Sequence, residues 1–318
     1  MQQERALTLA APARMRRGFW TDALVRLMRN RLALAGGTII LLLVLSAIFA
    51  PWVAPKGYAE ASLEDNYATP GAKYLLGADF LGRDLLSRII YGTRVSLTVG
   101  VVGATTATLI GIIYGSVSGY YGGRLDSWMM RFVDLMYALP TLLVIILLMV
   151  FFRSTALFGE QLNIFARTIF NLDRAMGGVF FIFIGIAITS WMTMARLVRG
   201  SILALKETEF VEAARTTGAG DIRIMVRHLL PNFLGPVIVA ETLNIPHYIL
   251  YEAFLSFIGL GVNAPTPSWG GMISEGVNGM RSFPHLVLFP AAALSITLLA
   301  FNFLGDGLRD ALDPRMRH

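Results

Sequence analysis

The chain has 318 residues, of which 55% are hydrophobic and 15% are charged, with a mean hydropathy of +0.60 and a formal net charge of +6. Apolar residues at this frequency, gathered in long blocks, are typical of an integral membrane protein and exclude a large soluble domain. The basic residues cluster at the ends of the apolar blocks, where they orient membrane helices, so the charge does not indicate nucleic-acid binding. The absence of cysteine excludes disulfides, thiolate metal sites and cysteine nucleophiles.

The N-terminal segment, residues 1–31, has seven arginines, no lysine and two acids. Within it Trp20, Leu24 and Met28 recur at helical spacing, which predicts a helix lying in the membrane interface, with a solvated tail as the alternative. The first span is expected at residues 32–53, because roughly 20 apolar residues cross the hydrocarbon core. The basic leader and the apolar run are both too long for a cleaved signal peptide.

Residues 54–93 are expected to form a polar loop on the opposite side, with an amphipathic lead-in to a second span at about 95–123. In that span Gly111, Gly115 and Gly119 repeat every four residues. Small-residue faces let membrane helices approach closely, so this repeat predicts packing against a partner helix.

Four more spans are expected along the chain, at about 135–152, 178–194, 233–257 and 284–303. Leu139-Pro140 predicts a kink in the third span. External loops at 153–177 and 259–276 follow the third and fifth spans.

Two glutamates interrupt the fifth span, Glu241 and Glu252. Eleven residues at 100° each bring them to one helical face, about 16 Å apart along the axis. Acids at this depth are costly unless they face protein or water, so Glu241, His247 and Glu252 are candidates for a substrate path. The alternative is that each glutamate only braces a neighbouring helix.

An even number of spans places both termini on one side of the membrane. The segments on that side hold 18 of the 27 lysines and arginines, against nine in the opposite loops. The positive-inside rule therefore predicts cytoplasmic termini and a cytoplasmic location for the polar segment 207–232.

This polar segment is expected to be a two-helix elbow. Thr208 or Glu207 is expected to cap the first helix, and Gly218 to end it in the left-handed conformation. Asp221 is expected to cap the second helix and Pro231 to stop it. An apolar stripe on that second helix is predicted at Ile222, Met225, Val226 and Leu229. The sequence contains no nucleophile with a base, no metal-ligand spacing and no phosphate-binding loop, so no catalytic, cofactor-binding or metal-binding residue is assigned.

Within this segment Glu212-Ala213-Ala214 is followed after three residues by Gly218, and after nine more by the stretch His228 to Pro231. The pattern resembles the EAA loop of ABC importer permeases. His228 departs from the isoleucine of the general pattern, in a form that resembles the peptide-importer branch. Three further stretches resemble the C-type subunit of the dipeptide/oligopeptide permease family, at residues 76–97, 252–261 and 267–276.

The resemblance implies an all-α integral membrane protein with the type I ABC importer permease fold, six transmembrane helices and both termini cytoplasmic. The expected organisation is a cytoplasmic N-tail with an interfacial helix, the first span, an extracytoplasmic loop, a five-helix core that includes cytoplasmic coupling helices at 203–231, and a short cytoplasmic tail. Their expected bounds are 1–31, 32–53, 54–93, 94–306 and 307–318.

The resemblance also implies a function and partners. The expected function is inward translocation of di- or oligopeptides by alternating access in a bacterial or archaeal cytoplasmic membrane, in contact with lipid. The partners would be a second homologous permease, two ABC ATPases and an extracytoplasmic binding protein. Since no GxxxxGK[ST] motif occurs here, ATP and Mg would be bound by the ATPases. The expected coupling residues are Glu212, Ala213, Ala214, Arg215, Gly218, Asp221, Leu230 and Pro231.

Three alternatives stay open. Other cargoes in this family are glutathione, nickel complexes and oligosaccharides. An ion-coupled secondary transporter would use Glu241 and Glu252 but leave the cytoplasmic elbow unexplained. A membrane scaffold would explain the elbow but not the acids of the fifth span.

Overall fold

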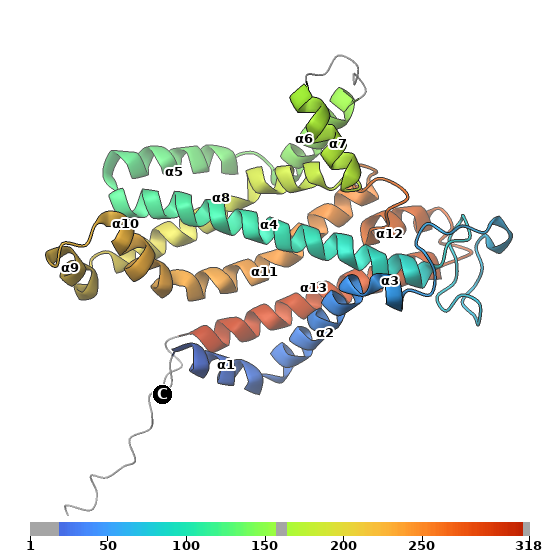
Figure 1. Ribbon diagram of the computed structural model, residues 1–318, viewed down its shortest axis with the longest axis horizontal. Coiled ribbons are helices and arrows are strands. Elements are labelled where there is room, and N and C mark those ends of the chain that lie inside the picture. Colours follow the sequence, from blue (N-terminus) through green and yellow to red (C-terminus); the bar gives the residue numbers. More distant parts are fainter. Residues whose placement is uncertain (1–18, 157–163, 314–318) are drawn as a thin grey trace, which may run out of the picture.

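The computed structural model describes residues 19–156 and 164–313, and the long helices run alongside one another (Figure 1). Within these residues, five helical segments are long and apolar enough to cross a membrane, or six if one bent pair counts as a span. The five are α2 (Arg31–Ile48), α4 (Leu85–Tyr121), α8 (Phe180–Leu205), α11 (Leu230–Phe257) with the helical turns before it, and α13 (His285–Leu312).

Shorter helices connect and flank these spans. They are α1 (Phe19–Arg29), α3 (Ala50–Val53), η1 (Leu63–Asp65), α5 (Gly123–Tyr137), α6 (Thr141–Ala156), α7 (Ile164–Ala175), α9 (Glu209–Thr216), α10 (Asp221–Arg223), a π-helical segment η3 (Ile224–Leu229) and α12 (Trp269–Val277). The sequence placed loops where α5, α7 and α12 lie. Of these, α12 begins at a cap in which the Ser268 hydroxyl accepts a hydrogen bond from the Gly271 N–H.

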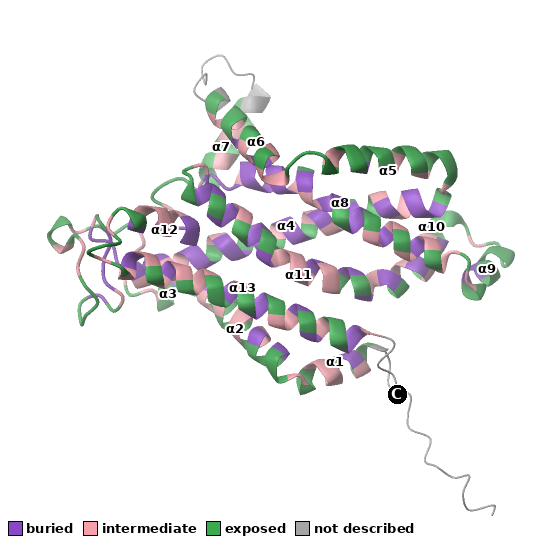
Figure 2. Cartoon of the chain, turned by 180° about the vertical axis from the view of Figure 1, so that it is seen from behind, coloured by how far each residue is buried: buried purple, intermediate pink, exposed green. Residues whose placement is uncertain are grey.

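The predicted glycine face is confirmed, and its partner is α8. A β-carbon built on Gly111 would lie 2.5 Å from the Met194 Cβ, and one on Gly115 would lie 2.4 Å from the Ala195 carbonyl oxygen. Gly119 continues the same row. The absence of side chains lets the two backbones touch, and the most buried part of the protein lies around α4, α8 and α11 (Figure 2).

The second span is longer than expected. The predicted amphipathic lead-in is part of the same helix, which begins at Leu85, because the Asp84 carboxylate caps it by accepting the Ser87 N–H at 2.7 Å. Its 37 residues extend about 55 Å, against a hydrocarbon core of about 30 Å. One or both ends of α4 must therefore reach beyond the core.

The third span departs most from expectation. In place of one kinked helix, α5 and α6 are bent by 77° at the break before Pro140, and α6 turns away from the bundle (Figure 1). Proline removes an N–H donor and disfavours helix at the residue before it. In addition, the Asp126 carboxylate of α5 accepts bonds of 2.5 and 2.6 Å from Arg199, which hold α5 along α8. The chain can turn only after α5 ends.

The two ends of the described chain pack together. The α13 helix continues to Leu312, so residues 307–312 of the tail expected at 307–318 are helical. A β-carbon on Gly307 would lie 2.2 Å from the Ala33 Cβ of α2, and α1 also packs on α13. The amphipathic helix predicted before the first span is present as α1, with Trp20, Leu24 and Met28 all at least half exposed. The arginines at positions 5 to 17 lie outside the described residues.

Candidate functional site

The predicted left-handed glycine ends α9 in a Schellman motif. Gly218 has φ +81°, its N–H bonds to the Arg215 carbonyl at 2.9 Å, and the Ala219 N–H bonds to the Ala214 carbonyl at 3.0 Å. The φ prediction is confirmed. The predicted cap is right in position only: Thr208 is the N-cap residue, but its hydroxyl donates backwards to the Leu205 carbonyl.

The polar segment 207–232, called the loop below, packs on the ends of the spans through an apolar cluster. Ile224, Leu229 and Phe233 are buried there with Val211 and Ala214 of α9. The expected stripe is half wrong: Leu229 is buried and Met225 is partly buried, but Ile222 is 73% exposed and Val226 is 58% exposed. It assumed α-helical spacing, whereas the π-helical η3 brings residues five apart, such as Ile224 and Leu229, onto one face.

A polar contact holds this loop against α4. The Tyr120 hydroxyl at the end of α4 donates to the Asp221 carboxylate at 2.7 Å, and the Arg215 guanidinium lies 5.7 Å from the Tyr120 ring centre. Asp221 therefore ties the loop to α4, and Gly220, with no side chain, occupies the N-cap position that was expected for Asp221.

The expected helix stop at Pro231 is also wrong. Pro231 lies in the first turn of α11, directly after the π-helical η3, and the helix continues through it. The helical path therefore runs from Asp221 through η3 into the span without a loop.

Most of the predicted coupling residues face outward. Ala214 is buried and Leu230 is partly buried, whereas the other six are exposed: Glu212, Ala213, Arg215, Gly218, Asp221 and Pro231. Beside the glycine turn lies a hollow of about 220 Å³, to which Arg223, Arg227 and His228 contribute. No acidic residue lines this hollow. The outward surface of the loop thus has an acidic and a small side chain at α9, basic side chains beside the Gly218 turn, and apolar side chains at Ile222 and Val226.

A second candidate site is a cavity of about 210 Å³ where the α5–α6 break meets α8 and α11. It is lined by hydroxyl, amide, imidazole and thioether side chains and by no carboxylate, lysine or arginine: Tyr137, Thr141, Thr189, Ser190, Met192, Thr193, Asn244, His247, Tyr248 and Tyr251. The Ser190 hydroxyl is buried there and has no hydrogen-bond partner within residues 19–156 and 164–313. This wall offers hydrogen bonds but no formal charge of its own.

The three predicted path residues have different surroundings. His247 lines the cavity. Glu241 is buried behind it, where one carboxylate oxygen accepts from the Tyr248 hydroxyl at 2.9 Å and the other has no partner among the described residues. Glu252 lies outside the cavity lining, fully buried, with its two oxygens accepting from Ser96 at 3.0 Å and Ser256 at 2.7 Å. For Glu252, these contacts favour the bracing alternative.

Other lining residues were not singled out from the sequence. Asn244, His247 and Tyr251 follow the i, i+3, i+7 spacing of one helical face, and Thr189 and Thr193 are four residues apart on α8. The signal was therefore polar residues at helical spacing inside apolar runs. Among the described residues, no group of three or more histidines, aspartates or glutamates could hold a metal ion.

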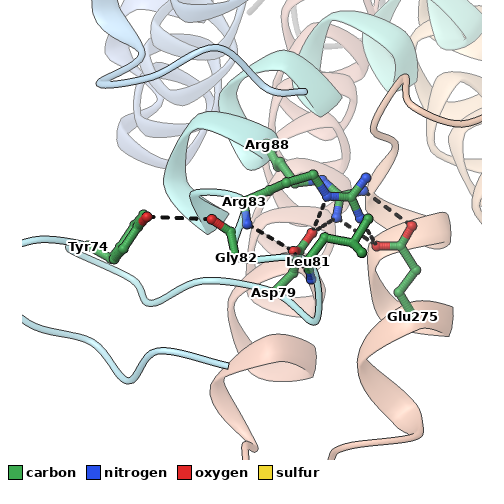
Figure 3. A network of polar contacts seen from close by, with 7 residues as sticks. All are labelled: Tyr74, Asp79, Leu81, Gly82, Arg83, Arg88 and Glu275. Carbon is green, nitrogen blue, oxygen red and sulfur yellow. Dashed lines mark hydrogen bonds and ion pairs between the residues drawn. The ribbon is translucent and has the colours of Figure 1, made fainter. Parts of the chain in front are cut away.

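At the other end of the bundle lies a buried ion-pair network that the sequence did not reveal (Figure 3). Asp79 accepts from the Arg83 Nε at 2.6 Å and from Arg88, and Glu275 of α12 accepts from the Arg88 Nη1 at 2.7 Å. The two arginines and Asp79 are at most 5% exposed in their side chains. The network fastens the segment before α4 to α12, about 190 residues further along the chain.

Residues 107–318 match the model of the family described as "Binding-protein-dependent transport system inner membrane component", and residues 18–70 match "N-terminal TM domain of oligopeptide transport permease C". The oligopeptide transport system permease protein OppC of Bacillus subtilis is 42% identical over 94% of this chain and 90% of that protein. The dipeptide transport system permease protein DppC of the same organism is 44% identical over 93% of this chain and 86% of its own length.

A solved structure has the same fold. The MetNI methionine ABC transporter in an inward-facing conformation aligns with a TM-score of 0.53 at 17% identity, over 70% of this chain and 96% of that chain. The likeness confirms the expected ABC importer permease fold.

Proposed function

The chain belongs to the family of binding-protein-dependent transport system inner membrane components, and we propose that it carries di- or oligopeptides inward as a permease subunit of an ABC importer. The peptide cargo is supported by the names and the extensive coverage of the oligopeptide and dipeptide permease relatives. In this proposal, a second permease, two ATPases that bind ATP and Mg, and an extracytoplasmic binding protein complete the transporter.

The α9 end of the bundle is assigned to the cytoplasm. The distribution of lysine and arginine supports this orientation, and α1 and the end of α13 lie toward the same end as α9 (Figure 1). The segment 54–84, the ion-pair network and α12 then lie on the extracytoplasmic side.

One observation carries the proposal: a continuous helical path joins the exposed loop to the cavity. From Asp221 to His247 the path runs about 39 Å without a loop, and it passes beside the α8 helix that forms the opposite cavity wall. A displacement applied at α9 would therefore move α11 as a rigid unit against its neighbours. Packed helix interfaces tend to adopt one of two arrangements, so a small shift can change one arrangement into the other.

The outward surface of the loop indicates the chemistry of the ATPase that it contacts. Ile222 and Val226 would enter an apolar recess of the ATPase, because they form an exposed apolar pair, four residues apart, at the end of the bundle that is assigned to the cytoplasm. Glu212 would meet a basic group, and the hollow beside Arg223 and Arg227 would receive an acidic one. Ala213 would allow close approach, and Gly218 would set the angle of the turn.

The cavity supports a peptide path better than an ion path. Its hydroxyl and amide groups suit the N–H and C=O groups that all peptides share, while its lack of formal charge would not exclude any side chain. His247, Asn244 and Tyr251 would contact the passing peptide. Glu241 would act behind this wall through Tyr248, and Glu252 would hold α11 to α4.

Transport by the complete complex in proteoliposomes tests the proposal. Uptake of peptide should need hydrolysable ATP and should persist when ion gradients are collapsed. Uptake without ATP that disappears with the ion gradient would instead indicate a secondary transporter.

Two variants then test whether the cavity is part of the peptide path. Asn244→Ala should change uptake while leaving the assembled complex as thermally stable as the wild type. Thr105→Ala is the matched control, since Thr105 is exposed on α4 and its hydroxyl bonds only to its own helix at Val101. Equal uptake by both variants would remove the cavity from the path.

A further inference from the structure

A groove of about 300 Å³ lies between α2 and α4, on the outside of the bundle. Its lining is apolar except for one threonine and one arginine: Val44, Ala47, Ile48, Arg94, Leu97, Thr98, Val101 and Val102. Val101 is 54% exposed in the groove. No acidic residue contributes to the lining.

The arginine is fixed at one end of the groove by the chain itself. The Arg94 Nε donates to the Ala47 carbonyl at 2.9 Å, and its Nη2 donates to the Ile48 carbonyl at 3.3 Å. The first carbonyl is free because Pro51 has no N–H to reach it, and the second because the Trp52 N–H bonds to Phe49 instead. These bonds orient the guanidinium.

The Arg94 guanidinium also lies 5.7 Å from the Tyr91 ring centre, but this contact supplies no formal negative charge. The two bonds use two of its five N–H groups, and no acidic residue of the described chain forms an ion pair with Arg94. A charged side chain beside hydrocarbon is costly unless an opposite charge meets it. The protein therefore presents an oriented positive charge above an apolar groove.

The depth of the arginine matches the boundary of the membrane. Arg94 lies level with Ile48, where the apolar helix α2 ends and the chain passes through α3 to the polar segment 54–84. Val44 and Val101 lie further along their helices, toward the middle of the spans. A positive charge at the boundary with apolar walls below it is complementary to a phospholipid, whose phosphate lies at the interface and whose acyl chains point toward the middle of the membrane.

We propose that this groove binds one anionic phospholipid, with its phosphate on Arg94 and an acyl chain between α2 and α4. A zwitterionic headgroup is disfavoured, because its ammonium would find no acid in the lining. The lipid would fill the space between the first span and the core, and so hold α2 in place.

Native mass spectrometry of the complete transporter, delipidated and then titrated with phosphatidylglycerol or phosphatidylcholine, tests this site. The wild type should retain phosphatidylglycerol in preference to phosphatidylcholine. Val101→Trp, which fills the groove without touching the arginine, and Arg94→Gln, which removes the charge, should each weaken retention about tenfold or more. Ile113→Trp is the control, since Ile113 is 66% exposed on the same helix but outside the groove.

Three results would overturn the inference. They are retention by Val101→Trp equal to that of Ile113→Trp, displacement of the lipid by excess inorganic phosphate, and efficient cross-linking of Thr98→Cys to the partner permease. The last measurement is clean because the sequence contains no cysteine. Arg94→Gln also leaves two carbonyls of α2 without a donor. If Arg94→Gln does not fold, the result for Val101→Trp tests the inference. The inference is independent of the transported cargo.

Discussion

Replacing Gly218 should uncouple ATP hydrolysis from uptake in proportion to how poorly the new residue tolerates a positive φ. The residue has φ +81°, and a β-carbon built on it meets nothing within 4 Å, so the penalty in this chain is purely conformational. A left-handed backbone costs an ordinary residue about 1–2 kcal/mol, and asparagine much less. We therefore expect Gly218→Asn to keep most coupling, Gly218→Ala to lose some, and the β-branched Gly218→Val to lose most.

The cost converts into a population shift of about fivefold to thirtyfold away from the native turn. The assay measures ATP hydrolysis and peptide uptake in the same proteoliposomes, so that coupling is their ratio. Gly200→Ala is the matched control, because Gly200 also has open space around it but lies in the helical conformation of α8. That control should couple like the wild type.

Two outcomes would refute this reasoning. If Gly218→Val couples like the wild type, the turn does not transmit motion. If the asparagine and valine variants uncouple equally, the glycine is needed for the close approach of a partner rather than for its backbone conformation.

Three further predictions concern stability. Gly115→Leu should lower the melting temperature of the purified complex through overpacking of at least 1–3 kcal/mol between α4 and α8, whereas Gly37→Ala, whose nearest outside atom would be 3.7 Å away, should not. Arg88→Met should destabilise by about 3–5 kcal/mol in denaturant titration, because it leaves Asp79 buried with one partner fewer; an unchanged midpoint would show that the network contributes nothing. Glu252→Leu should cost about 1–3 kcal/mol by removing the acceptor of two serine hydroxyls, with Glu252→Gln milder, and a loss of uptake at full stability would return this residue to the path.

The sequence predicted the spans and the polar loop because both depend on local composition. Apolar blocks located five of the six expected helices, and the spacing of Gly111, Gly115 and Gly119 predicted a close helix contact. The left-handed turn at Gly218 also follows from one residue type at one position.

Its errors arose where a distant residue decides the local structure. From the sequence, Asp221 could cap a helix or accept a hydrogen bond from elsewhere in the chain. It accepts from Tyr120, which is about 100 residues away on α4. The position of Ile224 on the same buried face as Leu229 depends on a π-helical segment, whose spacing no α-helical stripe predicts.

The membrane location, the helical spans and the family follow from the sequence alone, because apolar run length and short motifs are properties of neighbouring residues. The direction of α6, the separation of His247 from Glu252, and the pairing of Arg88 with Glu275 were decided only in the folded chain. Each depends on contacts between segments far apart in the sequence. A buried polar group takes whichever partner the packing brings near, and the sequence around that group does not record which partner that is.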